Sequence, residues 1–185
     1  MVVVGIGYFL GWNKVKDFWI ETGRDDISLT IEEATEFANI HDYSKDKITS
    51  EEMQKLEKYR SMGLVEFAST HYELYDKIKN LRPIRQGIRA AQEEELFVLF
   101  GAEKAASFEN FPLVYPITGM QAIIWRYSDG KRTISEIGDI LYFAGHQLLP
   151  DGSLPPNRLN IREFLEDYMK SLLILQEFTL VSLRF

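Results

Sequence analysis

The sequence predicts an α+β fold, and three observations indicate it. Helix starts carry capping boxes, in which a threonine is followed three residues later by a glutamate, as in Thr30 with Glu33 and Thr49 with Glu52. Apolar residues recur at the spacing of an amphipathic helix in residues 160–176. Short β-prone stretches, PIRQGIR, ELFVLF and FPLVYPI, are separated by turn or charged residues. The sequence therefore combines helices with a small antiparallel sheet.

The opening run MVVVGIGYFLGW has the glycine content of a nucleotide-binding turn. Such a turn works only when a helix follows the glycines and aims its first amides at a pyrophosphate. Here Gly7 is followed by Tyr8 and Phe9, whose bulk would block a close approach of the backbone to a ligand. We therefore expect an apolar strand and a bend, without a nucleotide.

The first third of the chain predicts two capped helices and a strand. The helices cover residues 29–40 and the segment from Thr49 to the stop at Gly63, and LVEF follows as a strand. The segments WIETGRDDISLTIEEATEF and WRYSDGKRTISEIGDIL share a tryptophan, a polar turn and a Thr-Ile-x-Glu helix start. This similarity indicates an internal duplication of a helix-turn-helix plus strand unit, which is the core of a winged helix.

The second part of the chain predicts three strands followed by three helices. A helix up to Leu81 ends before Pro83, and the β-prone stretches after it form an antiparallel meander. The three helices are expected at residues 119–127, 133–143 and 160–176. The predicted organisation is a winged-helix-like unit at 1–70, a linker helix at 71–82 and a second winged-helix-like unit at 83–185, with the three-stranded sheet.

Composition excludes several classes of protein. The 185 residues are 45% hydrophobic and include no cysteine, which excludes disulfides, thiolate metal sites and a cysteine nucleophile. The histidines, His41, His71 and His146, are too far apart in sequence to suggest a metal site, so neither a metal nor another cofactor is expected. No apolar run reaches the roughly 18 residues that span a bilayer. We expect a cytoplasmic protein without a membrane partner.

The order of elements after Arg82 resembles that of the PqqD-like group, the RiPP recognition elements. These domains, named after the peptide-binding chaperone of pyrroloquinoline quinone biosynthesis, bind the leader segment of ribosomally made precursor peptides. The resemblance covers residues 82–182. It is carried by ITGMQAIIWRYSDGKRTISEI, whose Asp129-Gly130 turn and Thr133-x-x-Glu136-Ile137 helix start fall into the family's order. The segment at 144–159 is longer than the usual link, and QEFTLVSLRF extends past the family's usual end.

The resemblance implies a peptide-binding groove between the third strand and the last helix. A guest peptide would add as a strand along residues 111–115, because an exposed strand edge offers unpaired amides and carbonyls. Apolar guest residues would contact the last helix, where an amphipathic ring and a thioether suit an adaptable surface. The implied peptide-binding residues are Phe111, Leu113, Val114, Tyr115, Arg162, Tyr168 and Met169.

A basic run precedes the predicted strands. It contains the candidate anion contacts Lys79, Arg82, Arg85 and Arg89. These side chains either meet acidic groups of a guest or phosphates, or form a solvated face beside the Glu93-Glu94-Glu95 patch.

The resulting function is a non-catalytic adaptor that captures the leader peptide of a precursor and presents it to a peptide-modifying enzyme. The alternative is a winged-helix DNA-binding transcriptional regulator. Nucleic acid is the less favoured partner, because the net charge is −7 and the helix at 160–176 carries more acidic than basic residues. Catalysis is not expected, since Asp129 and Glu136 fit a turn and a helix cap better than an acid–base pair.

Overall fold

The protein has an α+β fold, as the sequence predicted. The computed structural model describes residues 1–12, 18–86, 89–93, 96–100, 114–144, 160–177 and 180–185. Among the described helices, none is both long enough and apolar enough to cross a membrane.

The first half of the chain forms a three-stranded antiparallel sheet, called a meander here, and a two-stranded antiparallel sheet, called a ribbon. In order it contains β1 (Val2–Gly5), β2 (Tyr8–Trp12), β3 (Phe18–Glu21), β4 (Asp26–Leu29), α1 (Ile31–Ala38), the 3-10 helix η1 (Ile40–Tyr43), α2 (Ser50–Ser61) and β5 (Val65–Ala68). Strands β2, β3 and β4 form an antiparallel three-stranded sheet, and β1 pairs antiparallel with β5.

The second half builds the same kinds of sheet. It contains α3 (His71–Ile78), β6 (Arg82–Arg85), β7 (Arg89–Glu93), β8 (Leu96–Phe100), β9 (Val114–Ile117), α4 (Gly119–Tyr127), α5 (Ile134–Ala144), α6 (Ile161–Glu177) and β10 (Val181–Arg184). Strands β7, β8 and β9 form an antiparallel meander, and β6 pairs with β10. The three predicted helices correspond to α4, α5 and α6, but the first predicted strand, PIRQGIR, is divided between β6, which pairs with β10, and the start of β7.

The capping boxes explain where the helices begin. The Thr30 hydroxyl accepts a hydrogen bond from the Glu33 amide at 3.2 Å, and the Glu33 carboxylate accepts one from the Thr30 amide at 3.0 Å. Thr49 and Glu52 form the same pair of bonds at the start of α2. Each box satisfies amides that the first helical turn leaves free, so these short sequence patterns fix the helix boundaries.

The opening run forms two strands rather than a strand and a bend. Val2–Gly5 is β1, as expected, but Tyr8–Trp12 is β2, which pairs with β3 through an irregularity between Phe9 and Gly11. Gly7 joins the two strands with a φ of 126°, and an added Cβ would overlap the side chain of Ile20. The glycine therefore serves the turn into the meander.

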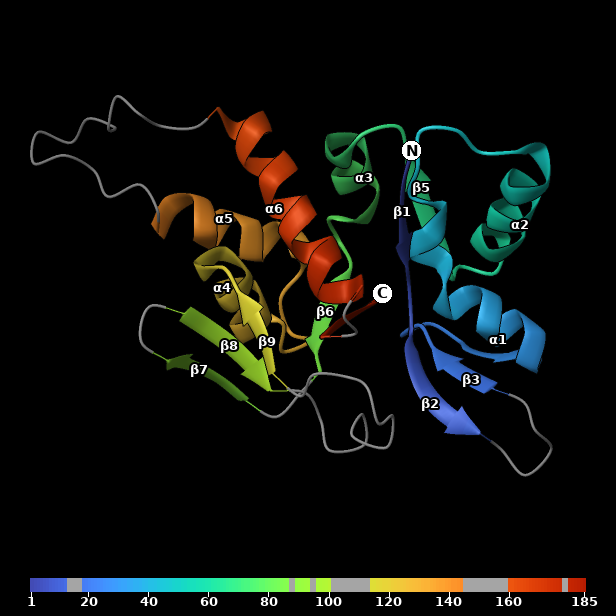
Figure 1. Cartoon of the computed structure of the whole chain (residues 1–185), viewed down its shortest axis with the longest axis horizontal. Helices are drawn as coiled ribbons and strands as arrows, with labels where there is room; N and C mark the ends of the chain where they lie inside the picture. Colours follow the sequence, from blue (N-terminus) through green and yellow to red (C-terminus); the bar gives the residue numbers. More distant parts are fainter. Residues whose placement is uncertain (13–17, 87–88, 94–95, 101–113, 145–159, 178–179) are drawn as a thin grey trace, which may run out of the picture.

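The β1–β5 ribbon lies between two hydrophobic cores. Val3 is fully buried in a core with residues of β3, β4 and α2, whereas Val4 is fully buried in a second core with residues of α3 to α6 and β10. Successive side chains of a strand point to opposite faces, so adjacent valines enter different cores. Figure 1 shows β1 and β5 at the centre, with α1 and α2 on one side and α3 to α6 on the other.

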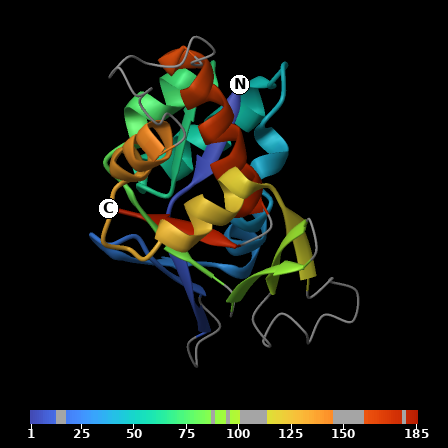
Figure 2. The same ribbon diagram turned by 90° about the vertical axis from the view of Figure 1, so that its left-hand side faces the viewer.

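The C-terminal strand joins the two halves a second time. The Gly7 amide donates to the Leu183 carbonyl at 2.7 Å, and the Phe185 amide donates to the Thr22 carbonyl at 2.7 Å. Figure 2 shows β10, in red, next to the C-terminus and close to the blue strands of the first half. Segments from the two ends of the sequence therefore share one backbone hydrogen-bond network.

The observed element order does not support the tryptophan alignment made from the sequence. Trp19 lies in β3, whereas Trp125 lies in α4, so the two residues occupy different elements. Both halves instead show a strand, a meander, helices and a returning strand that pairs with the first one. The threonine that matches Thr30 in this order is Thr118, which caps α4 directly after β9.

We predict that Val3→Ala and Val4→Ala each lower the free energy of unfolding by about 1–3 kcal/mol, since each removes buried methyl groups from a different core. Urea denaturation measures the change, with Lys47→Ala as a matched exposed control. Changes no larger than the control's would show that the ribbon is not packed on both faces.

Candidate functional site

The free edge of β9 is the candidate functional site. β9 pairs with β8 through Val114 to Ile117, and within the described residues no strand pairs with its other side. Its backbone therefore presents groups that a further strand can use. Of the residues expected to bind a guest, Val114 and Tyr115 lie in β9, whereas Phe111 and Leu113 lie outside the described residues.

Pro116 indicates which backbone groups of β9 face outward. Proline has no N–H and is accommodated in a sheet where its nitrogen points away from the neighbouring strand. Successive residues of a strand alternate in direction, so the Val114 amide also points away from β8, while Tyr115 and Ile117 pair with it. The outer edge thus offers the Val114 amide and the carbonyls of Val114 and Pro116.

Helix α4 follows β9 directly and contacts α6. Thr118 caps α4 directly after the strand, and the Ser171 hydroxyl of α6 lies 3.4 Å from the sulfur of Met120. Ile123 of α4 is 38% exposed, one helical turn from this contact. Ile174 of α6 is 41% exposed and lines the cleft beside α3 that is described below.

Tyr168 and Met169 do not lie at a groove, in contrast to the expectation from the resemblance. Both are fully buried in the core, and the Tyr168 hydroxyl donates to the Ile134 carbonyl at 2.8 Å. They share the buried face of α6 with Leu165 and Leu172, as their helical spacing requires. Burial and the fixed hydrogen bond leave neither side chain available to a guest.

Arg162 faces another part of the molecule. Its guanidinium lies 5.3 Å from the ring centroid of Tyr72 in α3, and its Nε lies 3.8 Å from a Glu166 oxygen. The spacing along the helix places Arg162 and Ser171 on opposite faces of α6. Arg162 therefore points away from the Met120 contact, and Ile174 lines the cleft beside α3.

The predicted anion contacts separate in the structure. Lys79 pairs with Asp76 at 3.0 Å. Arg82 donates to the Lys131 carbonyl, and Arg85 donates to the Arg126 carbonyl at 3.2 Å and lies 5.4 Å from the Trp125 ring centroid. Arg89 lies in β7, where only the backbone is described. Arg82 and Arg85 thus connect β6 by hydrogen bonds to the turn after α4 and to the last turn of α4, respectively.

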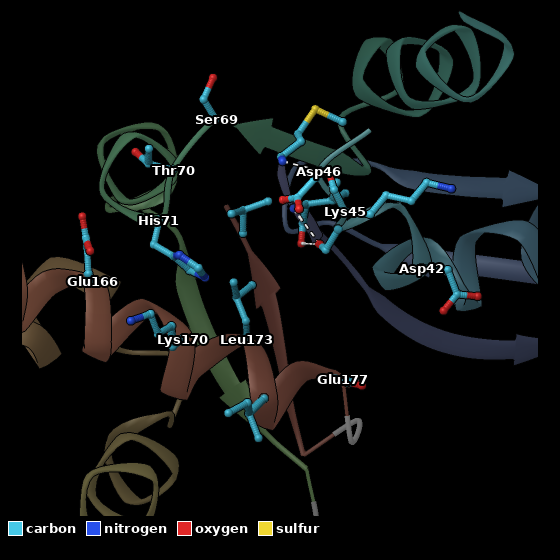
Figure 3. Close-up of a pocket in the computed structure, with 15 residues that line it drawn as sticks. Asp42, Lys45, Asp46, Ser69, Thr70, His71, Glu166, Lys170, Leu173 and Glu177 are labelled. Atoms are coloured by element: carbon cyan, nitrogen blue, oxygen red, sulfur yellow. Dashed lines mark hydrogen bonds between the residues drawn. The ribbon is translucent and has the colours of Figure 1, made fainter. Parts of the chain in front are cut away.

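A cleft of about 740 Å³ opens between α3, α6 and the loop before α2. Figure 3 shows His71, Lys170 and Leu173 on one wall and Lys45 and Asp46 on the other. Lys45 already pairs with Glu52 at 2.6 Å, and Lys170 pairs with Asp167 at 3.1 Å. Both lysines therefore have carboxylate partners, and the Met1 ammonium, which also lines the cleft, donates to the Lys45 carbonyl at 2.9 Å. The residues that line it are Met1, Val2, Val3, Asp42, Ser44, Lys45, Asp46, Ser69, Thr70, His71, Glu166, Lys170, Leu173, Ile174 and Glu177.

The cleft perturbs one titratable group. Burial lowers the pKa of His71 below its ordinary value, and the nearby positive charge of Lys170 lowers it further, whereas Glu166 opposes the shift. The neutral imidazole is therefore the form that the fold favours.

Asp129 and Glu136 hold the backbone, as predicted. Asp129 accepts from the Lys131 amide at 3.0 Å and pairs with Arg132 at 3.0 Å. Glu136 accepts from the Thr133 amide at 2.7 Å, which caps α5. In the described part of the chain, no three histidine, aspartate or glutamate side chains gather where they could hold a metal ion.

Comparison with known proteins identifies no relative. No protein-family model, curated protein or solved structure matches the chain.

We predict that acid destabilises the protein partly through His71. Its pKa in the fold lies below the ordinary value of 6.5, so its contribution to stability is complete above about pH 6.5 and is lost as the pH falls through the folded-state pKa. His71→Gln should therefore lose less stability than the unmodified protein between about pH 7 and pH 5.5. Urea midpoints at the two pH values measure this. Equal losses in the two proteins would contradict the prediction.

Proposed function

We propose that the protein is a non-catalytic recognition module whose second winged-helix-like unit binds an extended peptide by strand addition along β9. The guest is the leader segment of a ribosomally made precursor, and the module presents it to a peptide-modifying enzyme. The observation that carries the proposal is the outer edge of β9, the last strand of a three-stranded meander, which is unpaired within the described residues.

The physical basis is the pairing of backbone groups along the edge. An extended guest can pair with the outward amide of Val114 and the outward carbonyls of Val114 and Pro116. Each such hydrogen bond contributes a net stabilisation of about 0.5–1.5 kcal/mol. Backbone pairing alone selects no sequence, so selection would come from guest side chains that contact exposed apolar residues of α4, such as Ile123.

DNA binding is supported less well by the same unit. In a winged helix the recognition helix enters the major groove, and α6 holds that place in the order of elements. The carboxylates Glu163, Glu166 and Asp167 of α6 are at least partly exposed and repel phosphate, and Glu177 follows them. Only Arg162 and Lys170 oppose them on this helix. A protein that makes several phosphate contacts needs a basic excess at the contact surface.

The guest is identified by purifying the tagged full chain from its native host, with nuclease-treated and untreated samples in parallel. The proposal predicts recovery of a short ribosomal peptide or its modifying enzyme, insensitive to nuclease. Recovery of specific DNA that is lost after nuclease treatment would contradict the proposal and favour a transcriptional regulator.

We predict that Val114→Pro weakens binding of the recovered peptide by about 2- to 10-fold, because it removes one outward donor worth about 0.5–1.5 kcal/mol. Val114→Ala keeps the amide and is the matched control. Isothermal titration measures both affinities, and circular dichroism checks the fold. If folded Val114→Pro binds as tightly as Val114→Ala, the guest does not pair with this edge.

A further inference from the structure

We propose that β4 is a second strand-accepting edge and that its guest is a basic extended peptide. This inference rests on the proposed function, since it extends strand addition to the first half of the chain. It is carried by a structural equivalence between the two halves and by the charges around β4.

The two halves match at the level of single backbone hydrogen bonds. The residue after β1, Ile6, donates its amide to Leu64, the residue before β5, at 2.6 Å. The residue after β6, Gln86, donates to Leu180, the residue before β10, at 2.7 Å. In each half, the residue after the first ribbon strand therefore bonds to the residue before the second ribbon strand.

The last helix and returning strand of each half also agree in sequence. In both halves the amide before the strand bonds back to the helix, as Leu64 to Tyr59 at 2.9 Å and Leu180 to Leu175 at 2.7 Å. All four of these side chains are buried. Identical residues recur at one constant spacing in the two halves: Met53 and Met169, Leu56 and Leu172, Leu64 and Leu180, and Val65 and Val181.

The equivalence makes β4 the counterpart of β9. Each is the last strand of its meander and is followed by a capping threonine and a helix, α1 or α4. With Thr30 matched to Thr118, Asp26 corresponds to Val114 and Ser28 to Pro116. Within the described residues, β4 pairs with β3 alone.

The turn before β4 fixes which of its backbone groups face outward. The Thr22 amide donates to the Asp25 carbonyl at 3.1 Å, so these two residues point toward each other. Alternation along an antiparallel pair then directs Ile27 toward β3, and Asp26 and Ser28 away from it. This direction agrees with that of Val114 and Pro116 in β9. Ser28 stands where β9 has Pro116, and serine has a backbone N–H that proline lacks. The β4 edge therefore offers one more hydrogen-bond donor than the β9 edge.

The surface around β4 has more acidic than basic side chains, with Arg24 of the preceding turn stacked over Phe185 at 3.7 Å from the ring centroid. Asp25, Asp26 and Glu32 are exposed and form no ion pair in the described part of the chain. The nearby cations of α2 are already paired, Lys58 with Glu33 at 2.7 Å and Lys55 with Glu36 at 3.1 Å.

The helix after β4 is more polar than the helix after β9 at one matched position, since Ile123 of α4 corresponds to Thr35 of α1. Ile31, the first residue of α1, is 44% exposed and adds apolar surface next to β4. The charge of a guest at β4 is selected by the three free carboxylates, which lysine or arginine side chains complement.

The test uses a fluorescein-labelled decapeptide of alternating lysine and valine, with alternating glutamate and valine as the matched probe. Fluorescence anisotropy on the full chain should show saturable binding of the basic probe only. Ser28→Pro copies the residue found at the equivalent position of β9, and it removes one outward donor. We expect it to weaken binding about 2- to 10-fold, whereas Ser28→Ala, which keeps the donor, leaves affinity unchanged.

Two outcomes would overturn the inference: absence of saturable binding of the basic probe, or equal affinity of folded Ser28→Pro and Ser28→Ala. Loss of basic-probe binding in Val114→Pro, with no effect of Ser28→Pro, would also overturn the inference, because it would mean that the probe binds at β9. The proposal for β9 is tested separately, by titration of the peptide recovered from the host. A failure at β4 is thereby distinguished from a failure of the proposed function.

Discussion

Burial of the β1–β5 ribbon on both faces is the constraint on which the rest of the structure depends. A strand with solvent on one face alternates apolar and polar residues, whereas β1 is a run of valines because each face meets a core. The ribbon therefore holds the α1–α2 half and the α3–α6 half against each other. Both meanders extend from this centre, and each leaves its last strand at an edge.

Local signals in the sequence predicted most of the helices. Thr49 and Glu52 marked the start of α2, and apolar spacing gave the bounds of α6 to within one residue, since both depend on neighbours a few positions apart. Pairing between distant segments was not predictable in this way. The pairing of β6 with β10 depends on contacts between segments that are far apart in the sequence. The strands formed by residues 8–29 likewise depend on their pairing with one another, which local sequence patterns do not reveal.

The candidate site was predictable in its backbone and not in its side chains. FPLVYPI indicated a strand, and β9 lies at an edge, consistent with Pro116. The choice of Tyr168 and Met169 was wrong because chemical suitability for a peptide was weighed above helical phase, which places both with Leu172 in the core. Ile174 falls outside that phase and is exposed. Helical phase alone places Ile174 outside the buried face of α6, where it lines the cleft beside α3.

The account's central claim is that β4 and β9 each present an open edge with alternating backbone direction. Amide hydrogen exchange of the free full-length protein, followed by NMR, tests it without any guest. The amides of Asp26, Ser28 and Val114 should exchange rapidly, and those of Ile27, Tyr115 and Ile117 should be protected by their ladder bonds. Uniform protection along β4 or β9 would contradict the account, because it would mean that the edge is already paired.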